Sequence, residues 1–329
     1  MMKKLAIFSL AVGCGGATTG AGSPDLAMTL PAGDGAATVD LSAKTGSSDL
    51  AGTRVIELPI GPIPLQPGQE RTVCSTFRLP TTEAIDVVRI DGSLAPGSHH
   101  LLFYRSKAGS ERKDIYNCQP LDTSGGDVPV FIAETEMMNA MPLPTGAAYL
   151  FEPGEMVRLE AHYLNASAKP IDGLGTIRIT VGAPGNYQRA DIMFCGSVLQ
   201  LAQKGVPPGA SSLSPGFWKP PAGIKVFGLT THQHQRGSLM TVDKSTSTAP
   251  GQNLIMGKPY DNPPFLVWDD ANLLTFGPDE GFRWQCHYQN NTNRTFRFGQ
   301  SAENDEMCFF WAYYYPSVGR FLSMGDCWR

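Results

Sequence analysis

Two histidines in the second half of the chain are spaced so that their side chains can act together. His232 and His234 are separated by a single residue, Gln233. In an extended strand, side chains two residues apart point to the same face, which presents the two imidazoles side by side. Such a pair is half of a binding site for a metal that prefers nitrogen ligands, such as copper or zinc. The alternative is a surface strand that carries two histidines without function.

Another pair of histidines is adjacent. His99 and His100 follow a turn at Gly97 and open a strand. Neighbouring strand residues face opposite sides, so both can bind one metal only if the strand is bulged there, which Gly97 would permit. Otherwise one histidine is buried and the other exposed. His162, taken alone, is typical of a hydrogen-bonded core residue, but with His99 and His100 it would complete a three-imidazole site with an open position.

Met307 is the soft ligand that such a chain could add. A methionine next to Cys308 is most often core filler, yet a thioether also favours Cu(I). Two histidines and one methionine would therefore suit a copper that reacts with O2 after reduction. His287, which follows Cys286, could be a further ligand, a base behind the ligands or a packed residue, and the packed residue is the preferred interpretation.

The elements that must position these residues are expected to be β-strands. Charged residues are only 17% of the chain, while glycine (36) and proline (26) are abundant, which suits short strands and turns. Short β-rich runs recur from Arg54 to Tyr315 with no long helix-period segment between them. We predict two all-β sandwich domains, 53–187 and 188–329, joined near Ala183-Pro-Gly-Asn186. The net charge of -4 and the lack of a basic run exclude nucleic acid as a partner.

The first 52 residues are expected to lie outside these domains. Residues 1–14 combine a basic start with a short apolar run, which indicates a secretory signal, and Ala11-Val-Gly-Cys14 is similar to a bacterial lipobox. Cys14 is then the candidate for lipidation, and an ordinary signal peptide cut nearby is the alternative. Residues 15–52 are Gly-, Ala-, Ser- and Thr-rich and predict a flexible linker. The protein is expected to be exported to the cell envelope, touching a membrane only through a lipid anchor.

Six cysteines follow the predicted leader. An even number in an exported protein predicts three disulfides, for which fifteen pairings are possible. The cysteines are Cys74, Cys118, Cys195, Cys286, Cys308 and Cys327.

Taken together, these residues resemble the copper type II, ascorbate-dependent monooxygenases, which include the peptidylglycine α-hydroxylating and dopamine β-monooxygenases. The resemblance spans about Cys74 to Cys327. It rests on five segments in the same order: Gly97-Ser-His-His-Leu-Leu-Phe-Tyr, Ala161-His-Tyr, Thr231-His-Gln-His, Glu306-Met-Cys and Tyr313-Tyr-Tyr-Pro.

The resemblance implies a fold and a cofactor set. It implies two jelly-roll-like antiparallel sandwiches facing each other across a solvent cleft, and two copper ions per chain. One copper, which donates electrons, would be bound by His99, His100 and His162. The other would be bound by His232, His234 and Met307, where O2 and substrate react. The disulfides implied are Cys74–Cys118, Cys195–Cys327 and Cys286–Cys308.

The implied activity is hydroxylation of a C–H bond of a small molecule or peptide, with O2 and ascorbate or a similar one-electron reductant. Peptide-directed members carry an arginine and a tyrosine that grip the peptide carboxylate, where this chain has Thr230 and Trp311. A carboxylate clamp needs a cation, which threonine does not supply. We therefore do not expect a C-terminal glycine-extended peptide as substrate.

Two other functions are compatible with some of these residues. A non-catalytic envelope copper-binding protein would need only one competent site. A zinc hydrolase would need three histidines and a nearby acidic base, which the sequence does not nominate. The monooxygenase is preferred because it alone accounts for five of the six histidines, Met307 and all six cysteines.

Overall fold

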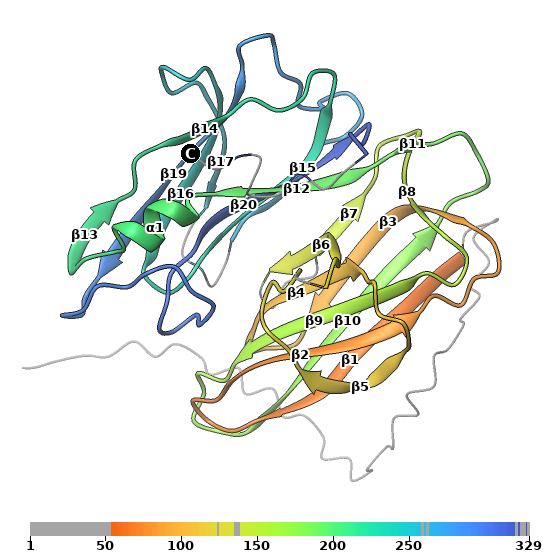
Figure 1. Ribbon diagram of the computed structural model, residues 1–329, viewed down its shortest axis with the longest axis horizontal. Coiled ribbons are helices and arrows are strands. Elements are labelled where there is room, and N and C mark those ends of the chain that lie inside the picture. Colours follow the sequence, from red (N-terminus) through yellow and green to blue (C-terminus); the bar gives the residue numbers. More distant parts are fainter. Residues whose placement is uncertain are drawn as a thin grey trace, which may run out of the picture. The chain divides into compact units, whose positions relative to one another are not determined.

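The computed structural model describes residues 54–123, 125–134, 139–257, 260, 263–319, 322 and 327, which belong to one compact unit. They are nearly all β-strand, with one short helix, α1 (Val198–Gln203), as Figure 1 shows. Within this part of the chain, no helix is both long and apolar enough to cross a membrane. The predicted leader with Cys14 and the predicted linker lie outside the described residues.

The first half of the described chain forms two sheets. One has the order β1-β10-β3-β8-β11, with β7 beside β3, and the other has the order β5-β2-β9-β4-β6. All pairs are antiparallel except β11 with β8. The strands are β1 (Arg54–Leu65), β2 (Glu70–Arg78), β3 (Ile85–Leu94), β4 (Ser98–Arg105), β5 (Arg112–Asn117), β6 (Val128–Glu134), β7 (Asn139–Pro142), β8 (Ala147–Phe151), β9 (Met156–Leu164), β10 (Ile171–Val181) and β11 (Gln188–Arg189).

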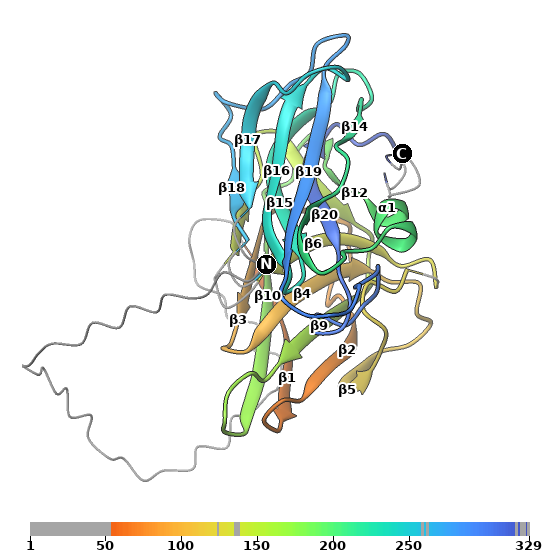
Figure 2. The same cartoon turned by 90° about the vertical axis from the view of Figure 1, so that its left-hand side faces the viewer.

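The second half forms two more antiparallel sheets, which Figure 2 shows from the side. One has the order β12-β20-β15-β18, and the other has the order β13-β19-β16-β17, with β14 beside β19. The strands are β12 (Asp191–Gly196), β13 (Gly209–Ser212), β14 (Gly216–Trp218), β15 (Lys225–Gln233), β16 (Gly237–Ser245), β17 (Gln252–Gly257), β18 (Phe265–Val267), β19 (Gly281–Asn290) and β20 (Cys308–Tyr315). The prediction of an all-β chain with jelly-roll-like sandwiches is confirmed. Sheet membership changes between Arg189 and Asp191, close to the predicted joint; the division into two domains stays a prediction.

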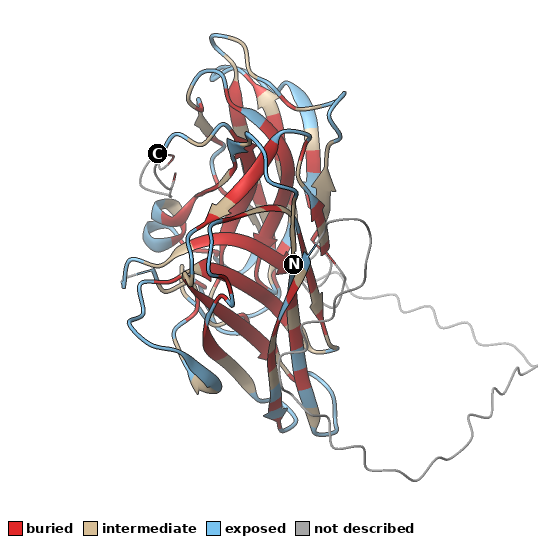
Figure 3. Ribbon diagram, turned by 90° about the vertical axis from the view of Figure 1, so that its right-hand side faces the viewer, coloured by how far each residue is buried: buried red, intermediate tan, exposed pale blue. Residues whose placement is uncertain are grey.

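Strand β20 separates two hydrophobic cores. Side chains alternate across a strand, so its odd-numbered and even-numbered residues face opposite sides. Phe309, Trp311 and Tyr313 pack into the core that also holds the N-terminal strands, whereas the even-numbered Phe310, Ala312 and Tyr314 pack into a core confined to the C-terminal half. Figure 3 shows that the strands of both halves are buried along much of their length, whereas exposed residues gather in the loops.

The two halves meet through apolar side chains. The ring of Phe131 on β6 lies 5.9 Å from that of Phe265 and 6.1 Å from that of Tyr313. The Tyr313 hydroxyl also accepts a hydrogen bond of 3.1 Å from the backbone N–H of Ile132. At this face the halves therefore share one core, where the family resemblance implies a solvent cleft.

The two halves repeat one sequence pattern that the sequence analysis did not identify. The eight residues Glu155, Arg158, Glu160, His162, Tyr163, Asn165, Ser167 and Lys169 recur at the same spacing as Glu280, Arg283, Gln285, His287, Tyr288, Asn290, Thr292 and Arg294. The structure repeats as well. The Asn165 side-chain amide donates to the carbonyl of Lys169, and that of Asn290 donates to the carbonyl of Arg294.

The repeat extends to an irregularity in the neighbouring strand. On β4, Ser98 pairs with Tyr163 and His100 with His162, so the intervening His99 is an extra, bulged residue. On β16, Gly237 pairs with Tyr288 and Leu239 with His287, so Ser238 is bulged in the same way. Ser238 and Leu239 thus stand where the N-terminal half has His99 and His100. Of the three imidazoles His99, His100 and His162, only His162 has a counterpart in the C-terminal half, which is His287.

Candidate metal centre

The bulge on β4 brings His99 and His100 to one site, as the sequence analysis required for both to bind one metal. Gly97, just before it, has φ of 84°, a left-handed conformation that glycine adopts without penalty. The ring centroids of His99 and His100 are 5.1 Å apart, and both residues are buried. His162 lies directly opposite His100 on β9, with a centroid distance of 5.1 Å.

His232 and His234 come from the end of β15. Their centroids are 5.4 Å apart, and both residues are buried. His232 pairs with Phe309 on β20, and Gln233 pairs with Cys308, so this register places Met307 opposite His234. Met307 is 1% exposed. The hydroxyl of Tyr288 donates to its carbonyl at 3.0 Å, which fixes its backbone.

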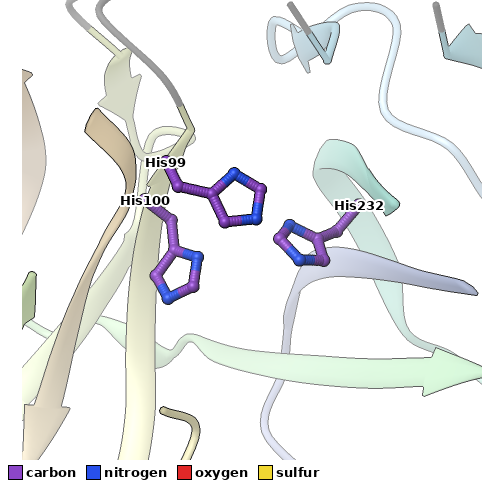
Figure 4. A group of neighbouring side chains, drawn as sticks. All are labelled: His99, His100 and His232. Atoms are coloured by element: carbon purple, nitrogen blue, oxygen red, sulfur yellow. The ribbon is translucent and has the colours of Figure 1, made fainter. Parts of the chain in front are cut away.

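The five histidines form a single buried cluster. His99 lies at its centre, with centroids 5.2 Å from His162, 4.9 Å from His232 and 5.4 Å from His234. The imidazoles assigned by resemblance to two separate coppers are therefore in contact. The three whose ligand nitrogens all lie within 4.8 Å of one another are His99, His100 and His232, which Figure 4 shows converging from both halves.

Several imidazole nitrogens in this cluster are buried without a hydrogen-bond partner. They are Nδ1 and Nε2 of His99 and His100, Nδ1 of His162 and Nε2 of His232. A buried polar atom without a partner destabilises the fold, so such atoms call for an explanation. A metal ion that accepts these lone pairs supplies one. The residues present therefore fit a copper ion.

Carboxylates orient two of the histidines. Nε2 of His162 lies 2.8 Å from Oε1 of Glu70, which leaves Nδ1 to bind a metal. Nδ1 of His232 lies 3.2 Å from both oxygens of Glu134, which leaves Nε2. In metal sites, a ligating histidine usually donates its other N–H to such a group, which fixes the ring orientation and raises ligand basicity.

Both carboxylates also connect the two halves. Glu134 ends β6, yet its partner His232 belongs to β15. Glu70 begins β2 and also accepts hydrogen bonds of 2.9 Å from the Ser301 hydroxyl and the Ala302 backbone N–H. Burial raises the pKa of Glu70, but the bonds from His162 and Ala302 outweigh it and hold that pKa below its usual value. A charged Glu70 thus ties His162 to the segment that leads to Met307.

Three of the histidines are held in the neutral form that a metal requires. Burial lowers the pKa of His99, His100 and His234 well below the usual value, and the neighbouring imidazoles lower it further. A proton on one of these rings would place a charge in a dry cluster, which is unfavourable. These rings are therefore unprotonated before a metal binds, and the metal does not have to displace a proton from them.

Comparison with known proteins identifies the half that carries His232, His234 and Met307. Residues 218–327 match the family model of the copper type II ascorbate-dependent monooxygenase, C-terminal domain. This part of the chain is similar to that family. The family is copper- and ascorbate-dependent, which agrees with the donor set of the cluster. No curated protein matches the chain.

Solved structures give only distant likenesses. The major capsid protein P2 from bacteriophage PM2 is 11% identical, covers 81% of this chain and 100% of its own, and has a TM-score of 0.33. The structure of the Macrobrachium rosenbergii nodavirus is 8% identical, covers 89% of this chain and 98% of its own, and has a TM-score of 0.18. Neither likeness bears on function.

A third carboxylate holds the methionine segment of the C-terminal half in place. Glu306 accepts hydrogen bonds from the backbone N–H groups of Arg236, His234 and Met307 at 2.7, 3.2 and 3.3 Å. Burial raises the pKa of Glu306 to about 7, against these bonds. Its contacts tie the His234 turn to Met307.

Three disulfides are present, and they join the pairs that the family resemblance implies: Cys74–Cys118, Cys195–Cys327 and Cys286–Cys308. The last joins β19 to β20 at the residue next to Met307. It therefore restrains the backbone at that position, where a thioether is a weak ligand.

Glu160 is the buried group nearest to His100 that sequence analysis missed. Its Oε1 lies 3.5 Å from Nε2 of His100, and it accepts a hydrogen bond of 2.9 Å from the Tyr104 hydroxyl. Burial raises its pKa to about 7. A sequence signal existed, since Glu160 lies two residues before His162 and so shares its strand face. Glu70 and Glu134 gave no such signal, because they come from other strands.

Thr230 and Trp311 lie one row of same-face side chains, which is two residues along the strand, from His232 and its partner Phe309. They pair across β15 and β20, and both are buried. Neither the Thr230 hydroxyl nor the Trp311 indole N–H has a hydrogen-bond partner. The Trp311 ring stacks on Phe194 with a centroid distance of 3.9 Å. His287 is half-buried on β19, and it is not among the ring contacts of the cluster.

Proposed function

We propose that the protein is a copper-dependent monooxygenase that hydroxylates a C–H bond with O2 and an ascorbate-type reductant. One copper would be held by His99, His100 and His162, and the other by His232, His234 and Met307. The observation that carries the proposal is the cluster of five buried histidines, four of which have unpartnered nitrogens and two of which, His232 and His234, lie in the segment that matches this family. When bound, the coppers supply the one-electron chemistry that activates O2.

The protein's own residues would position and tune this chemistry. Glu70 and Glu134 orient the rings of His162 and His232, so that each presents a defined nitrogen. The His99 and His232 rings are 4.9 Å apart, so no solvent lies between the two ligand sets at that point. Burial of all five imidazoles excludes water from the space they enclose, which limits side reactions of a reactive oxidant.

The substrate would be a neutral small molecule, or a peptide without a carboxylate near the reacting carbon. The residues that support this are Thr230 and Trp311, which are one row from His232 and offer two uncharged donors without partners. A hydroxyl and an indole N–H suit a carbonyl or hydroxyl oxygen, whereas a carboxylate calls for a cation. Binding there would require side chains to move, because both residues are buried.

The proposal includes the location. We infer an exported, envelope-bound enzyme whose two copper-binding domains span 53–187 and 188–329. Three disulfides are compatible with export, because such bonds persist in oxidising compartments. Lipidation at Cys14 remains a prediction, and that residue lies outside the described part of the chain.

A non-catalytic copper-binding protein is the second candidate, and one observation favours it. The nitrogens of His99, His100 and His232 lie within 4.8 Å of one another, an arrangement that could hold a single ion between the halves. A single closed site of this kind would store or carry copper without oxidising a substrate.

Copper binding by the full chain, with disulfides intact, tests these functions. We expect two coppers per chain after loading and exhaustive dialysis. His162→Ala should lose one ion, and Met307→Ala should weaken the other. Consumption of O2 with ascorbate, in the presence of a substrate library, should then yield a product that carries one oxygen atom from O2.

Other outcomes would decide against the monooxygenase. One copper per chain that is lost in His99→Ala and His232→Ala alike, with no effect of Met307→Ala, would establish the single-ion protein. Retention of zinc in preference to copper would reject both candidates.

A further inference from the structure

A hollow on the N-terminal half lies beside a polar stripe that leads to the histidines. Its cavity volume is about 580 Å³, which exceeds the volume of a small sugar-like molecule. Most of the residues that line it are polar or charged. Its lining includes Lys107, Ala108, Tyr116, Asn117, Asp127 and Arg158.

The stripe follows one face of strand β9. Arg158, Glu160 and His162 are spaced by two residues, so they share a face. Tyr104 pairs with Arg158, and His100 pairs with His162, on the neighbouring β4. At roughly 3.3 Å per residue, Arg158 in the wall lies about 13 Å along the strand from the histidine row. Glu160 lies halfway between Arg158 and His162 along this strand.

Contacts along this stripe are continuous. Nη2 of Arg158 lies 3.9 Å from Oε2 of Glu160, and the guanidinium also stacks on the Tyr104 ring at 4.2 Å. Oε1 of Glu160 lies 3.5 Å from Nε2 of His100. Arg158 is 7% exposed and Glu160 is fully buried. A single carboxylate therefore separates the wall of the hollow from a residue of the three-histidine set.

The lining of the hollow carries two cations, Lys107 and Arg158, and two carboxylates, Asp122 and Asp127. A small anion with several hydroxyl groups would pair there with Lys107, which takes part in no ion pair with either of these carboxylates. Asp127 is already engaged, because it lies 2.8 Å from Nε of Arg158 and accepts hydrogen bonds from the Ser106 hydroxyl and the Lys107 backbone N–H. Nε of Arg158 is not aligned to donate to it and has no other partner. The ammonium of Lys107, at an exposed position, adds positive charge. Asn117 and Tyr116 supply polar groups for hydroxyls.

We propose that this hollow binds the reductant, an enediol anion of the ascorbate class, and that Arg158, Glu160 and His100 connect it to the metal. The inference rests on the proposed function, which assigns copper to His99, His100 and His162. These imidazoles are at most 3% exposed, so a reductant from solvent cannot contact them directly. The hollow gives it a binding site within about 13 Å of the histidine row.

The reduction balances with one electron and one proton. The ascorbate monoanion gives one electron to copper(II), which becomes copper(I), and it releases one proton to water in the open hollow. It leaves as the ascorbyl radical anion. A second molecule repeats the step for the second electron that hydroxylation consumes.

The test fills the hollow without touching a metal ligand. Ala108 is exposed and lines the hollow, so Ala108→Trp adds bulk there; Ala271→Trp, at an exposed position outside the hollow, is the matched control. The metal-free full chain is titrated with ascorbate under anaerobic conditions, and binding is followed by saturation-transfer NMR. We expect saturable binding by wild type and Ala271→Trp, and an affinity reduced about tenfold or more in Ala108→Trp. Lys107→Gln should weaken ascorbate but not inositol, an uncharged polyol of similar size.

The copper-loaded full chain supplies the second measurement. The rate at which ascorbate removes the copper(II) EPR signal should saturate in wild type and fall about tenfold or more in Ala108→Trp. Dithionite should reduce both equally, which shows that the copper sites and the fold are intact.

Equal ascorbate affinity and equal reduction rates in Ala108→Trp and Ala271→Trp would overturn the assignment of the hollow and leave the monooxygenase standing. Ascorbate binding at the hollow by a chain that takes up no copper on loading would instead reject the proposed function.

Discussion

Glu134→Gln is the substitution that best separates the two proposed copper sites. Glu134 is 2% exposed, and both of its oxygens lie 3.2 Å from Nδ1 of His232. Glutamine keeps the side-chain volume and one acceptor oxygen, so no cavity forms. What it removes is the negative charge that makes the His232 imidazole a stronger ligand.

The size of the effect follows from the geometry. Loss of a carboxylate partner of a ligating histidine typically costs about 10- to 100-fold in metal affinity, or about 1.4 to 2.8 kcal/mol. The 3.2 Å distances are long for a charge-assisted bond, so we expect the lower end, about tenfold. The matched control is Glu70→Gln, whose oxygen lies at 2.8 Å from His162 and whose loss should cost more.

Competition titration with a chromophoric chelator would measure each affinity, and the copper(II) EPR spectrum would identify which ion is affected. Glu134→Gln should weaken only the ion of His232, His234 and Met307. Glu70→Gln should weaken only the ion of His99, His100 and His162. The reasoning fails if both substitutions weaken the same ion, because His99, His100 and His232 would then bind one metal together. It also fails if neither has an effect.

Three further changes have expected outcomes. Gly97→Ala should lower the free energy of unfolding by about 1–2 kcal/mol in urea titrations. The reason is that φ is 84° at Gly97 and the new Cβ would lie 2.6 Å from Cδ1 of Ile171. An unchanged urea midpoint would show that the turn relaxes freely. Replacing Cys286 and Cys308 by serine opens a loop with a sequence separation of 22 and should lower the free energy of unfolding by about 3 kcal/mol through loop entropy. Copper loss from this variant is to be compared with copper loss from Met307→Ala. Burial raises the pKa of Asp191 above its unfolded value, so its contribution to stability is present at low pH and is lost as pH rises through the folded pKa. Asp191→Asn should therefore gain stability relative to wild type as pH rises from about 4. A difference in thermal unfolding that stays constant with pH would contradict this.

The β character of the chain could be predicted from composition and local pattern. Cys308–Tyr315 is an unbroken apolar run, which is typical of a strand buried on both faces, and β20 does face a core on each side. The sequence left open whether the strand is bulged at His99, which two adjacent histidines need in order to share a metal, and the structure places a bulge there. Comparison of the two His-Tyr segments, at His162 and His287, would have shown the internal repeat before the structure did.

The rest depended on contacts between distant strands. Glu70 and Glu134 are ordinary surface-type residues by sequence, and nothing local links them to His162 or His232. Their roles follow from strand order, which pairs β6 with β4 and β9 with β2. Pairing of this kind is fixed by long-range packing, which local periodicity does not encode.

The sequence by itself determined which residue types carry the chemistry: imidazoles at same-face or bulged spacing, one thioether and an even set of cysteines. It did so because side-chain direction along a strand depends on local geometry alone. Only the tertiary structure decided that His99 meets His232 at 4.9 Å, that both ligand sets are buried together, and that carboxylates from one half hold residues of the other. Those contacts exist because the two sandwiches share a hydrophobic core, and that core forms only when both halves are folded.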